Sequence, residues 1–192
     1  MKRRLGRDFF VPAAGEKTEE IAKRLLGKYI VRRIGDRKIW GKIVETEVYG
    51  GPRDKACHAY GGKVTPRNKL MYAAGGRAYV YLIYGMHWQL NFITQKSGVP
   101  ECVLVRALEV EGDDPRAASG PGKLCRFLEV DKSFHGEDVV TSKDFWLEDR
   151  GVEVARREIV SGPRVNIDYA GPHWAKRNWR FYLKNNSAVS RK

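Results

Sequence analysis

The stretch AYVYLIYGMHWQLNFIT, residues 78–94, indicates the fold class most directly. Two runs of β-branched and aromatic residues, 78–84 and 88–94, flank the tripeptide Gly85-Met86-His87. Such runs around a short glycine-containing turn are typical of a β-hairpin with a tight tip. In an extended first run, Tyr79 and Tyr81 point to one side and Tyr84 points to the other. We therefore expect a protruding hairpin that carries Tyr84 where the chain turns.

Further elements are predicted on both sides of this hairpin. Residues 16–26 have acids first, bases last and apolar residues at helical spacing, and Gly27 ends that helix. A second helix is expected from Gly120 through Leu128, and residues 111–160 otherwise show turn signals and little periodicity. The other strand candidates are 29–33, 38–49, 102–110, 164–167 and 180–183.

Short turns rather than crossover helices join most of these strands, which favours antiparallel pairing. The sequence thus predicts an α+β protein, a single compact domain over residues 1–192. Its core would be a mixed, mainly antiparallel and curled β-sheet with the protruding hairpin and surrounding helices. Residues 185–192 are expected to form a frayed tail. The connection 50–76, rich in Gly, Pro and charge, is predicted to be a functional loop with at most a short helix around 68–72.

The charge is strongly basic and unevenly distributed. The 192 residues contain 36 Lys and Arg against 23 Asp and Glu, a net charge of +13. Residues 1–70 hold 18 basic and 8 acidic side chains, and residues 161–192 hold 7 and 1, whereas 111–160 are acidic on balance. Nucleic acid is the expected partner of such a surface, because Lys and Arg release the counterions of phosphate. A basic protein that is merely soluble is the alternative.

Location and membrane association can also be predicted from composition. The longest apolar run, 78–86, falls well short of the roughly 20 residues that span a bilayer, so no membrane partner is expected. The basic start of the chain is not followed by an apolar stretch, so a secretory signal is not predicted. Three cysteines are too few for a disulfide framework. We expect an intracellular protein, cytoplasmic at the nucleoid if the host is prokaryotic.

Two carboxylates fall on one face of the strand predicted at 38–49. Period two places Glu45 and Glu47 together with Ile39, Ile43 and Tyr49, and places Trp40, Val44 and Val48 opposite. Apolar surroundings raise the pKa of a carboxyl group, which suits a general acid or base near neutral pH. The alternative is a solvated face on which Glu45 and Glu47 pair with nearby lysines.

An aromatic ring at a hairpin tip beside a basic surface can enter a base stack, at an unstacking cost of a few kcal/mol. This is the function that the position of Tyr84 suggests. The alternative is that all three tyrosines occupy a half-buried pleated surface, which tyrosine favours in any sheet.

Other patterns carry less information. Cys57-His58 has no second Cys or His at a ligand spacing, and His87, His135 and His173 form no such pattern, so neither a metal nor a cofactor is predicted. The run Gly120-Pro-Gly-Lys123-Leu124 has Leu where a phosphate loop needs Ser or Thr. Its amides and Lys123 are candidates for one DNA phosphate contact, and helix capping is the alternative.

Four separated motifs, in order along the chain, resemble the alkyladenine (3-methyladenine) DNA glycosylase family. They are GKIVETEVY at 41–49, TPRN at 65–68, YVYLIYGM at 79–86 and SGPGKLC at 119–125. The resemblance extends from about Leu25 to Tyr182. It implies a monofunctional enzyme of base excision repair that flips a damaged purine out of duplex DNA. The N-glycosidic bond of 3-methyladenine, hypoxanthine or a similar lesion would then be hydrolysed by an activated water.

The same resemblance implies roles for individual residues. Glu47 matches the general base, whereas Glu45 matches no catalytic position. Arg106 and the backbone carbonyl of Val165 would hold the water. Tyr49, His58 and Tyr81 match the rings that stack around the flipped base, and His58 would also donate a hydrogen bond to it from its backbone or ring. Asn91 matches the residue that crowds the 2-amino group of guanine. Tyr84 matches the residue that fills the position vacated in the base stack.

Departures and alternatives remain. His87-Trp88 stands where family members vary, and Gly50-Gly51 adds backbone freedom after Tyr49, so either pair is expected to affect which lesions fit. No lysine matches a nucleophile, which argues against strand cleavage through a Schiff base. The expected partner is double-stranded DNA containing damaged purines, bound by a monomer. The other functions considered are a non-catalytic nucleic-acid-binding protein and a hydrolase or transferase acting on free nucleosides.

Overall fold

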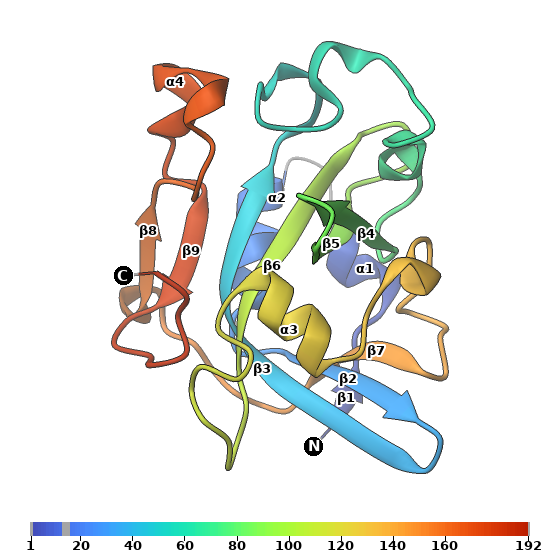
Figure 1. Cartoon of the computed structure of the whole chain (residues 1–192), viewed down its shortest axis with the longest axis vertical. Helices are drawn as coiled ribbons and strands as arrows, with labels where there is room; N and C mark the ends of the chain where they lie inside the picture. The colour runs from blue at the N-terminus through green and yellow to red at the C-terminus, as the bar shows by residue number, and fades with distance from the viewer. Residues whose placement is uncertain (1, 13–15, 192) are drawn as a thin grey trace.

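A computed structural model of the chain describes residues 2–12 and 16–191. A nine-stranded sheet runs through this part of the chain, in the order β1-β7-β2-β3-β6-β5-β4, with β9 paired to β3 and β8 to β9 (Figure 1). Its strands are β1 (Arg3–Arg4), β2 (Tyr29–Ile34), β3 (Arg37–Tyr49), β4 (Ala78–Ile83), β5 (His87–Thr94), β6 (Glu101–Glu109), β7 (Phe145–Asp149), β8 (Ile159–Gly162) and β9 (Arg180–Leu183). The pairings between these strands are antiparallel. The predicted α+β class with a mainly antiparallel sheet is therefore confirmed.

Four α-helices and several 3₁₀ turns surround the sheet in the described residues. The helices are α1 (Arg7–Phe10), α2 (Thr18–Leu25), α3 (Pro121–Phe127) and α4 (Pro172–Ala175). The 3₁₀ turns are Gly51–Arg53, Tyr60–Gly62, Lys69–Tyr72, Lys132–Phe134, Arg156–Glu158 and Asp168–Ala170. The predicted helices near 16–26 and 120–128 correspond to α2 and α3. No helix in the part of the chain described here is both long and apolar enough to cross a membrane.

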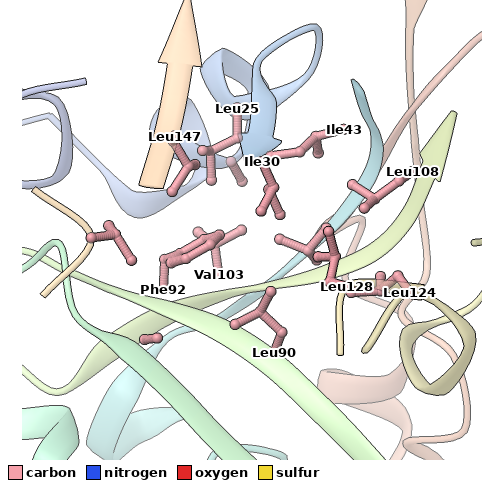
Figure 2. Close-up of a cluster of buried hydrophobic side chains, with 14 of the residues drawn as sticks. Leu25, Ile30, Ile43, Leu90, Phe92, Val103, Leu108, Leu124, Leu128 and Leu147 are labelled. Atoms are coloured by element: carbon pink, nitrogen blue, oxygen red, sulfur yellow. The ribbon is translucent and has the colours of Figure 1, made fainter. Parts of the chain in front are cut away.

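The core joins α2 and α3 to the strands. Leu25 of α2, Leu124 of α3, Phe92 of β5, Val103 of β6 and Leu147 of β7 belong to one buried cluster (Figure 2). Burying each such side chain contributes roughly 1.5–3 kcal/mol, so this cluster supplies a large share of the stability of the fold. Because it includes strands from both ends of the chain, it also fixes the long strand β3 from which the site is built.

Strand β3 is 13 residues long and pairs on both edges. Its first half forms the predicted hairpin with β2, while residues 45–47 pair with β9 and residues 42–49 pair with β6. The register with β6 shifts between Ile43 and Glu45 and again between Glu45 and Thr46. A bulge of this kind breaks the alternation of side chains and redirects those that follow.

The face predicted for β3 is consequently wrong in its first half. Ile43 lies in the main core, whereas Val44 packs in a smaller cluster with residues near the end of the chain. The bulge precedes Glu45, Glu47 and Tyr49, so these three side chains keep the predicted common face. A period-two pattern does not reveal a bulge, because the extra residue changes no residue type.

The second predicted hairpin is confirmed as β4 and β5, which pair from Ala78↔Phe92 to Ile83↔His87. At its tip, Tyr84 has φ 51° and Gly85 has φ 69°. Positive φ at consecutive positions gives the turn a twist that matches the flanking strands, and glycine adopts it without steric cost. The tip therefore projects the ring of Tyr84, which is 83% exposed, away from the sheet.

Two predictions about the last third of the chain are wrong. Residues 164–167 do not form a strand, because Asn166 has φ 59°, which is incompatible with an extended chain. The strand that pairs with β9 at its outer edge is β8, which ends at Gly162. The tail predicted to fray over 185–192 is ordered in the described residues 185–191. Ala188 and Val189 are buried, because they cover Val44 on one side of β3. Strands β7 and β8 lie in the segment 111–160 and just after it, where little periodicity was visible.

Candidate active site

A cleft of about 820 Å³ opens between the β4–β5 hairpin, the start of α3 and the loop after residue 164. Seven residues singled out from the sequence line it: Tyr49, His58, Tyr81, Tyr84, Arg106, Lys123 and Val165. They come from six separate stretches of chain, and the fold alone brings them together. The arrangement is an elongated, aromatic and basic cleft.

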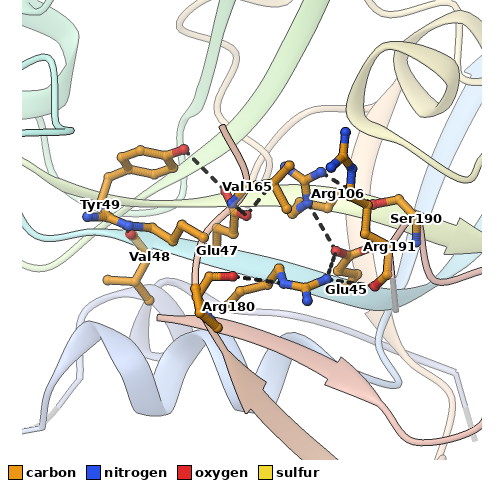
Figure 3. A network of polar contacts seen from close by, with 11 residues as sticks. Glu45, Glu47, Val48, Tyr49, Arg106, Val165, Arg180, Ser190 and Arg191 are labelled. Atoms are coloured by element: carbon orange, nitrogen blue, oxygen red, sulfur yellow. Dashed lines mark hydrogen bonds and ion pairs between the residues drawn. The ribbon is translucent and has the colours of Figure 1, made fainter. Parts of the chain in front are cut away.

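Glu47 lies behind the cleft wall with a fully buried carboxylate. The Val165 backbone N–H donates to Glu47 Oε1 at 2.8 Å, and the Tyr49 hydroxyl donates to Oε2 at 3.2 Å (Figure 3). Burial raises the pKa of Glu47, and Arg106 and the Val165 N–H oppose that shift only in part. Glu47 is therefore more basic than an ordinary glutamate, and its hydrogen-bond partners Tyr49 and Val165 line the cleft.

The structure places Val165 beside Glu47 through its backbone N–H. The hydrogen bond from this N–H orients one oxygen of Glu47. The contact of its carbonyl with a catalytic water, which the resemblance implies, stays a prediction.

Arg106 bridges the two glutamates of β3. Its Nε donates to Glu45 Oε1 at 3.0 Å, and its Nη1 lies 3.4 Å from Glu47 Oε1. Glu45 also accepts from Arg180 Nη1 at 2.9 Å and from the Ser190 backbone N–H at 2.7 Å. The alternative of a solvated face with lysine partners is wrong, because both carboxylates are buried and their partners are arginines and backbone amides.

The aromatic pocket is formed by His58, Tyr79 and Tyr81. The rings of His58 and Tyr81 meet edge to face with centroids 4.6 Å apart, and the Tyr79 hydroxyl lies 2.8 Å from His58 Nδ1. The same hydroxyl lies 3.2 Å from the Arg67 carbonyl, which is a further acceptor for it. Donation from His58 to the base, by its backbone or its ring, stays a prediction.

Burial, together with the nearby Arg67, lowers the pKa of His58 to about 4. The ring is therefore neutral at physiological pH, and it does not repel a cationic base. Asn68 fixes this segment by donating to the His58 carbonyl at 2.8 Å. The motif TPRN at 65–68 thus has a structural function in holding the pocket.

Asn91 does not line the main cleft. It borders a small cavity of about 10 Å³ behind Tyr81, and its Nδ2 donates to the Tyr79 carbonyl at 3.1 Å. Its role in selecting the base stays a prediction.

Besides Arg106, which pairs with the two glutamates, four cations line the cleft: Arg67, Lys123, Arg126 and Arg191. Lys123 and Arg126 belong to α3, and Lys123 Nζ donates to the Arg116 carbonyl at 3.3 Å. The predicted phosphate contact of Lys123 is not tested by this arrangement, but its position at the cleft rim is compatible with one.

Sequence reasoning missed a buried ion pair that supports the site. Arg164 Nη1 and Nη2 lie 2.5 and 2.8 Å from the two oxygens of Asp54, and both side chains are fully buried. Asp54 also accepts from the backbone N–H groups of Gly50 and Ala56. The guanidinium lies 5.0 Å from the ring centroid of Tyr49, in cation–π geometry. The pair thus ties together the loop after β3, the loop holding Val165 and the ring of Tyr49.

Tyr169 is a further aromatic residue of the cleft that sequence reasoning missed. It is largely exposed and lies in the loop that also holds Val165. Within residues 2–12 and 16–191, no three His, Cys, Asp or Glu side chains come together in a way that would hold a metal ion.

Comparisons with known proteins cover nearly the whole chain. A family model described as methylpurine-DNA glycosylase matches residues 13–187. A relative from Methanocella arvoryzae is 44% identical over 201 residues, which cover 98% of this chain and 96% of the relative. Relatives from Borreliella burgdorferi (42% identical, 90% and 94% covered) and Desulfitobacterium hafniense (40% identical, 98% and 98% covered) match similarly. All three are assigned by name as 3-methyladenine DNA glycosylases.

Proposed function

The chain belongs to the methylpurine-DNA glycosylase family and is an enzyme of the 3-methyladenine DNA glycosylase type, and we propose that it hydrolyses the N-glycosidic bond of flipped, damaged purines with a water activated by Glu47. The observation that carries this proposal is the buried Glu47 carboxylate, which lies directly behind the wall of an aromatic and basic cleft and is bonded to its lining residues Tyr49 and Val165. The substrate is DNA. Its duplex form, the flipping step and the catalytic water are parts of the proposal.

Glu47 accepts a proton from water in this mechanism. The oxygen of that water attacks C1′ of the deoxyribose as the bond from C1′ to the purine nitrogen breaks and the purine leaves with the bonding electrons. Burial supports this role, because a carboxylate with a raised pKa is a better base. Val165 holds one carboxylate oxygen in place, and Tyr49 holds the other.

Selection of the base is assigned to the rings of the cleft. An alkylated purine is cationic, and a cation stacks more strongly on aromatic faces than a neutral base does. The neutral state of His58 supports this role, since its ring adds no repelling charge beside the base.

The proposal extends to lesion range and setting. Hypoxanthine is included as a substrate, and Asn91 is proposed to disfavour guanine from behind Tyr81. We further propose that the enzyme acts as a monomer inside the cell, at the nucleoid if the host is prokaryotic, because chromosomal DNA is its substrate. Mass spectrometry of the bases released from a duplex of mixed lesions tests the proposal. Release of 3-methyladenine with an intact strand supports it, and a chain that releases no damaged base contradicts it.

Replacing Tyr84 with Ser should impair excision from duplex DNA more than from single strands. The ring at the hairpin tip is proposed to fill the position vacated by the flipped base, and a single strand has no such position to fill. We expect roughly a tenfold loss with duplex and little loss with single-stranded DNA, because unstacking costs a few kcal/mol. Tyr60→Ser, which removes an exposed ring outside the cleft lining, is the control. An equal loss on both substrates would assign Tyr84 a packing role only.

Duplex binding should weaken steeply with salt. If the four cations of the cleft each neutralise one phosphate, the logarithm of affinity falls with that of salt concentration by a slope of about −3 to −4. A fourfold rise in salt then costs roughly 100-fold in affinity. Fluorescence anisotropy with a labelled undamaged duplex measures this slope. A slope near zero would show that the basic cleft does not contact the DNA backbone.

A further inference from the structure

The second glutamate of β3, Glu45, lies at the centre of a closed polar network (Figure 3). It is fully buried and accepts hydrogen bonds from Arg106 Nε at 3.0 Å, Arg180 Nη1 at 2.9 Å and Ser190 N–H at 2.7 Å. Two arginines and a backbone amide satisfy its oxygens. A carboxylate held in this way cannot rotate toward the cleft without breaking charge-assisted bonds.

Arg106 is shared unequally between the two glutamates. It makes a hydrogen bond of normal length to Glu45, whereas its nearest approach to Glu47 is 3.4 Å. Charge-assisted hydrogen bonds between nitrogen and oxygen are typically about 2.7–2.9 Å long. Glu47 is therefore attracted by the guanidinium but not fully paired with it.

The end of the chain completes the network. The Ser190 N–H donates to Glu45, and Arg106 Nη2 donates to Ser190 Oγ at 3.3 Å. Arg180 Nη1 also donates to the Arg191 carbonyl at 2.8 Å. Because Ala188 and Val189 are buried beside β3, this segment has a fixed position against the sheet.

We propose that Glu45 and the Ser190 amide are positioning groups, which hold Arg106 away from Glu47 so that Glu47 can accept a proton from water. This inference rests on the proposed function of Glu47. Two arginines face two carboxylates here, with Arg164, the Tyr49 hydroxyl and the Val165 N–H as the other polar groups beside Glu47. If Glu45 loses its charge, Glu47 becomes the charged partner of Arg106, and we expect the guanidinium to move closer to it. A closer ion pair favours the charged form of Glu47 and makes it a weaker base.

Glu45→Gln tests this in single-turnover excision of 3-methyladenine from duplex DNA, measured as a function of pH. We expect at least a tenfold lower rate at neutral pH, an acid limb displaced to lower pH and duplex affinity within about twofold of wild type. Glu101→Gln, on a partly buried glutamate of β6 that bonds to Thr18 outside the cleft, is the matched control and should keep the wild-type profile. A slower Glu45→Gln enzyme with an unmoved acid limb would overturn the proposal, since a merely structural role predicts that result.

Ser190→Pro and Ser190→Ala form a second, independent pair. Both remove the hydroxyl, but only proline removes the N–H that Glu45 accepts. We expect the proline variant to show the displaced acid limb and the alanine variant to lie closer to wild type. If Glu45→Gln fails to fold, this pair decides alone, and equal profiles for the two variants would overturn the proposal. A wild-type enzyme that releases no base would instead refute the proposed function itself.

Discussion

Replacing Glu47 with Gln should abolish base release while DNA binding survives. Gln has nearly the same shape and retains a carbonyl oxygen to accept from the Val165 N–H, but it cannot take a proton from water. General base catalysis contributes about 100- to 10,000-fold, so we expect a loss in that range or larger. Single-turnover excision from a duplex containing 3-methyladenine, with anisotropy for the binding step, measures both effects.

This substitution, together with assays on free nucleosides, distinguishes between the functions that the sequence left open. Unchanged excision would refute Glu47 as the base. If the protein cleaves free nucleosides and its affinity for DNA does not depend on salt concentration, a nucleoside hydrolase would be favoured. Glu101→Gln again serves as the control, because it neutralises a glutamate outside the cleft.

The wild-type rate should also depend on pH in a defined direction. Glu47 acts as a base only when ionised, and burial raises its pKa above that of an ordinary glutamate. Excision should therefore fall as the pH drops through this raised value, at a higher pH than for an exposed carboxylate. Because the pKa of His58 is lowered to about 4, its ring stays neutral near neutral pH and should cause no second fall in the excision rate there.

The local parts of the fold were predictable because each rests on neighbouring residues. Alternation and turn residues predicted both hairpins, and the charge order of 16–26 predicted α2. The bulge near Val44 was not predictable, since the shift arises from how β6 and β9 pair with β3. Strand β7 escaped notice because its five residues show too short a pattern.

The site was predictable as a set of residue types but not as a set of contacts. Resemblance placed Glu47 and Arg106 together, and the structure puts them 3.4 Å apart. The function of the chain's end could not be predicted, because Ser190 and Glu45 are separated by 145 residues and the donor is a backbone amide. The pairing of Asp54 with Arg164 could not be predicted for the same reason, because the two residues lie 110 positions apart.

Of the substitutions considered, Asp54→Ala should cause the largest loss of stability. The substitution leaves the Arg164 guanidinium fully buried without a counter-charge, and breaking a buried pair in this way costs about 3–5 kcal/mol. For a chain of this length, that corresponds to a drop in Tm of roughly 10 °C. Urea and thermal unfolding followed by circular dichroism measure the change.

Asp144→Ala is the matched control, because Asp144 pairs with Arg33 at 2.8 Å on the surface, where such pairs contribute about 1 kcal/mol or less. Similar losses for the two variants would show that burial of the Asp54 pair is energetically unimportant. A second arm replaces Asp54 with Leu and Arg164 with Met together, which removes both charges at once. Recovery of stability without recovery of excision would then separate the two functions of the pair. Since Arg164 also lies against Tyr49 and next to Val165, we expect that separation: an apolar pair can fill the space, but it cannot hold the ring and the Val165 N–H where Glu47 needs them.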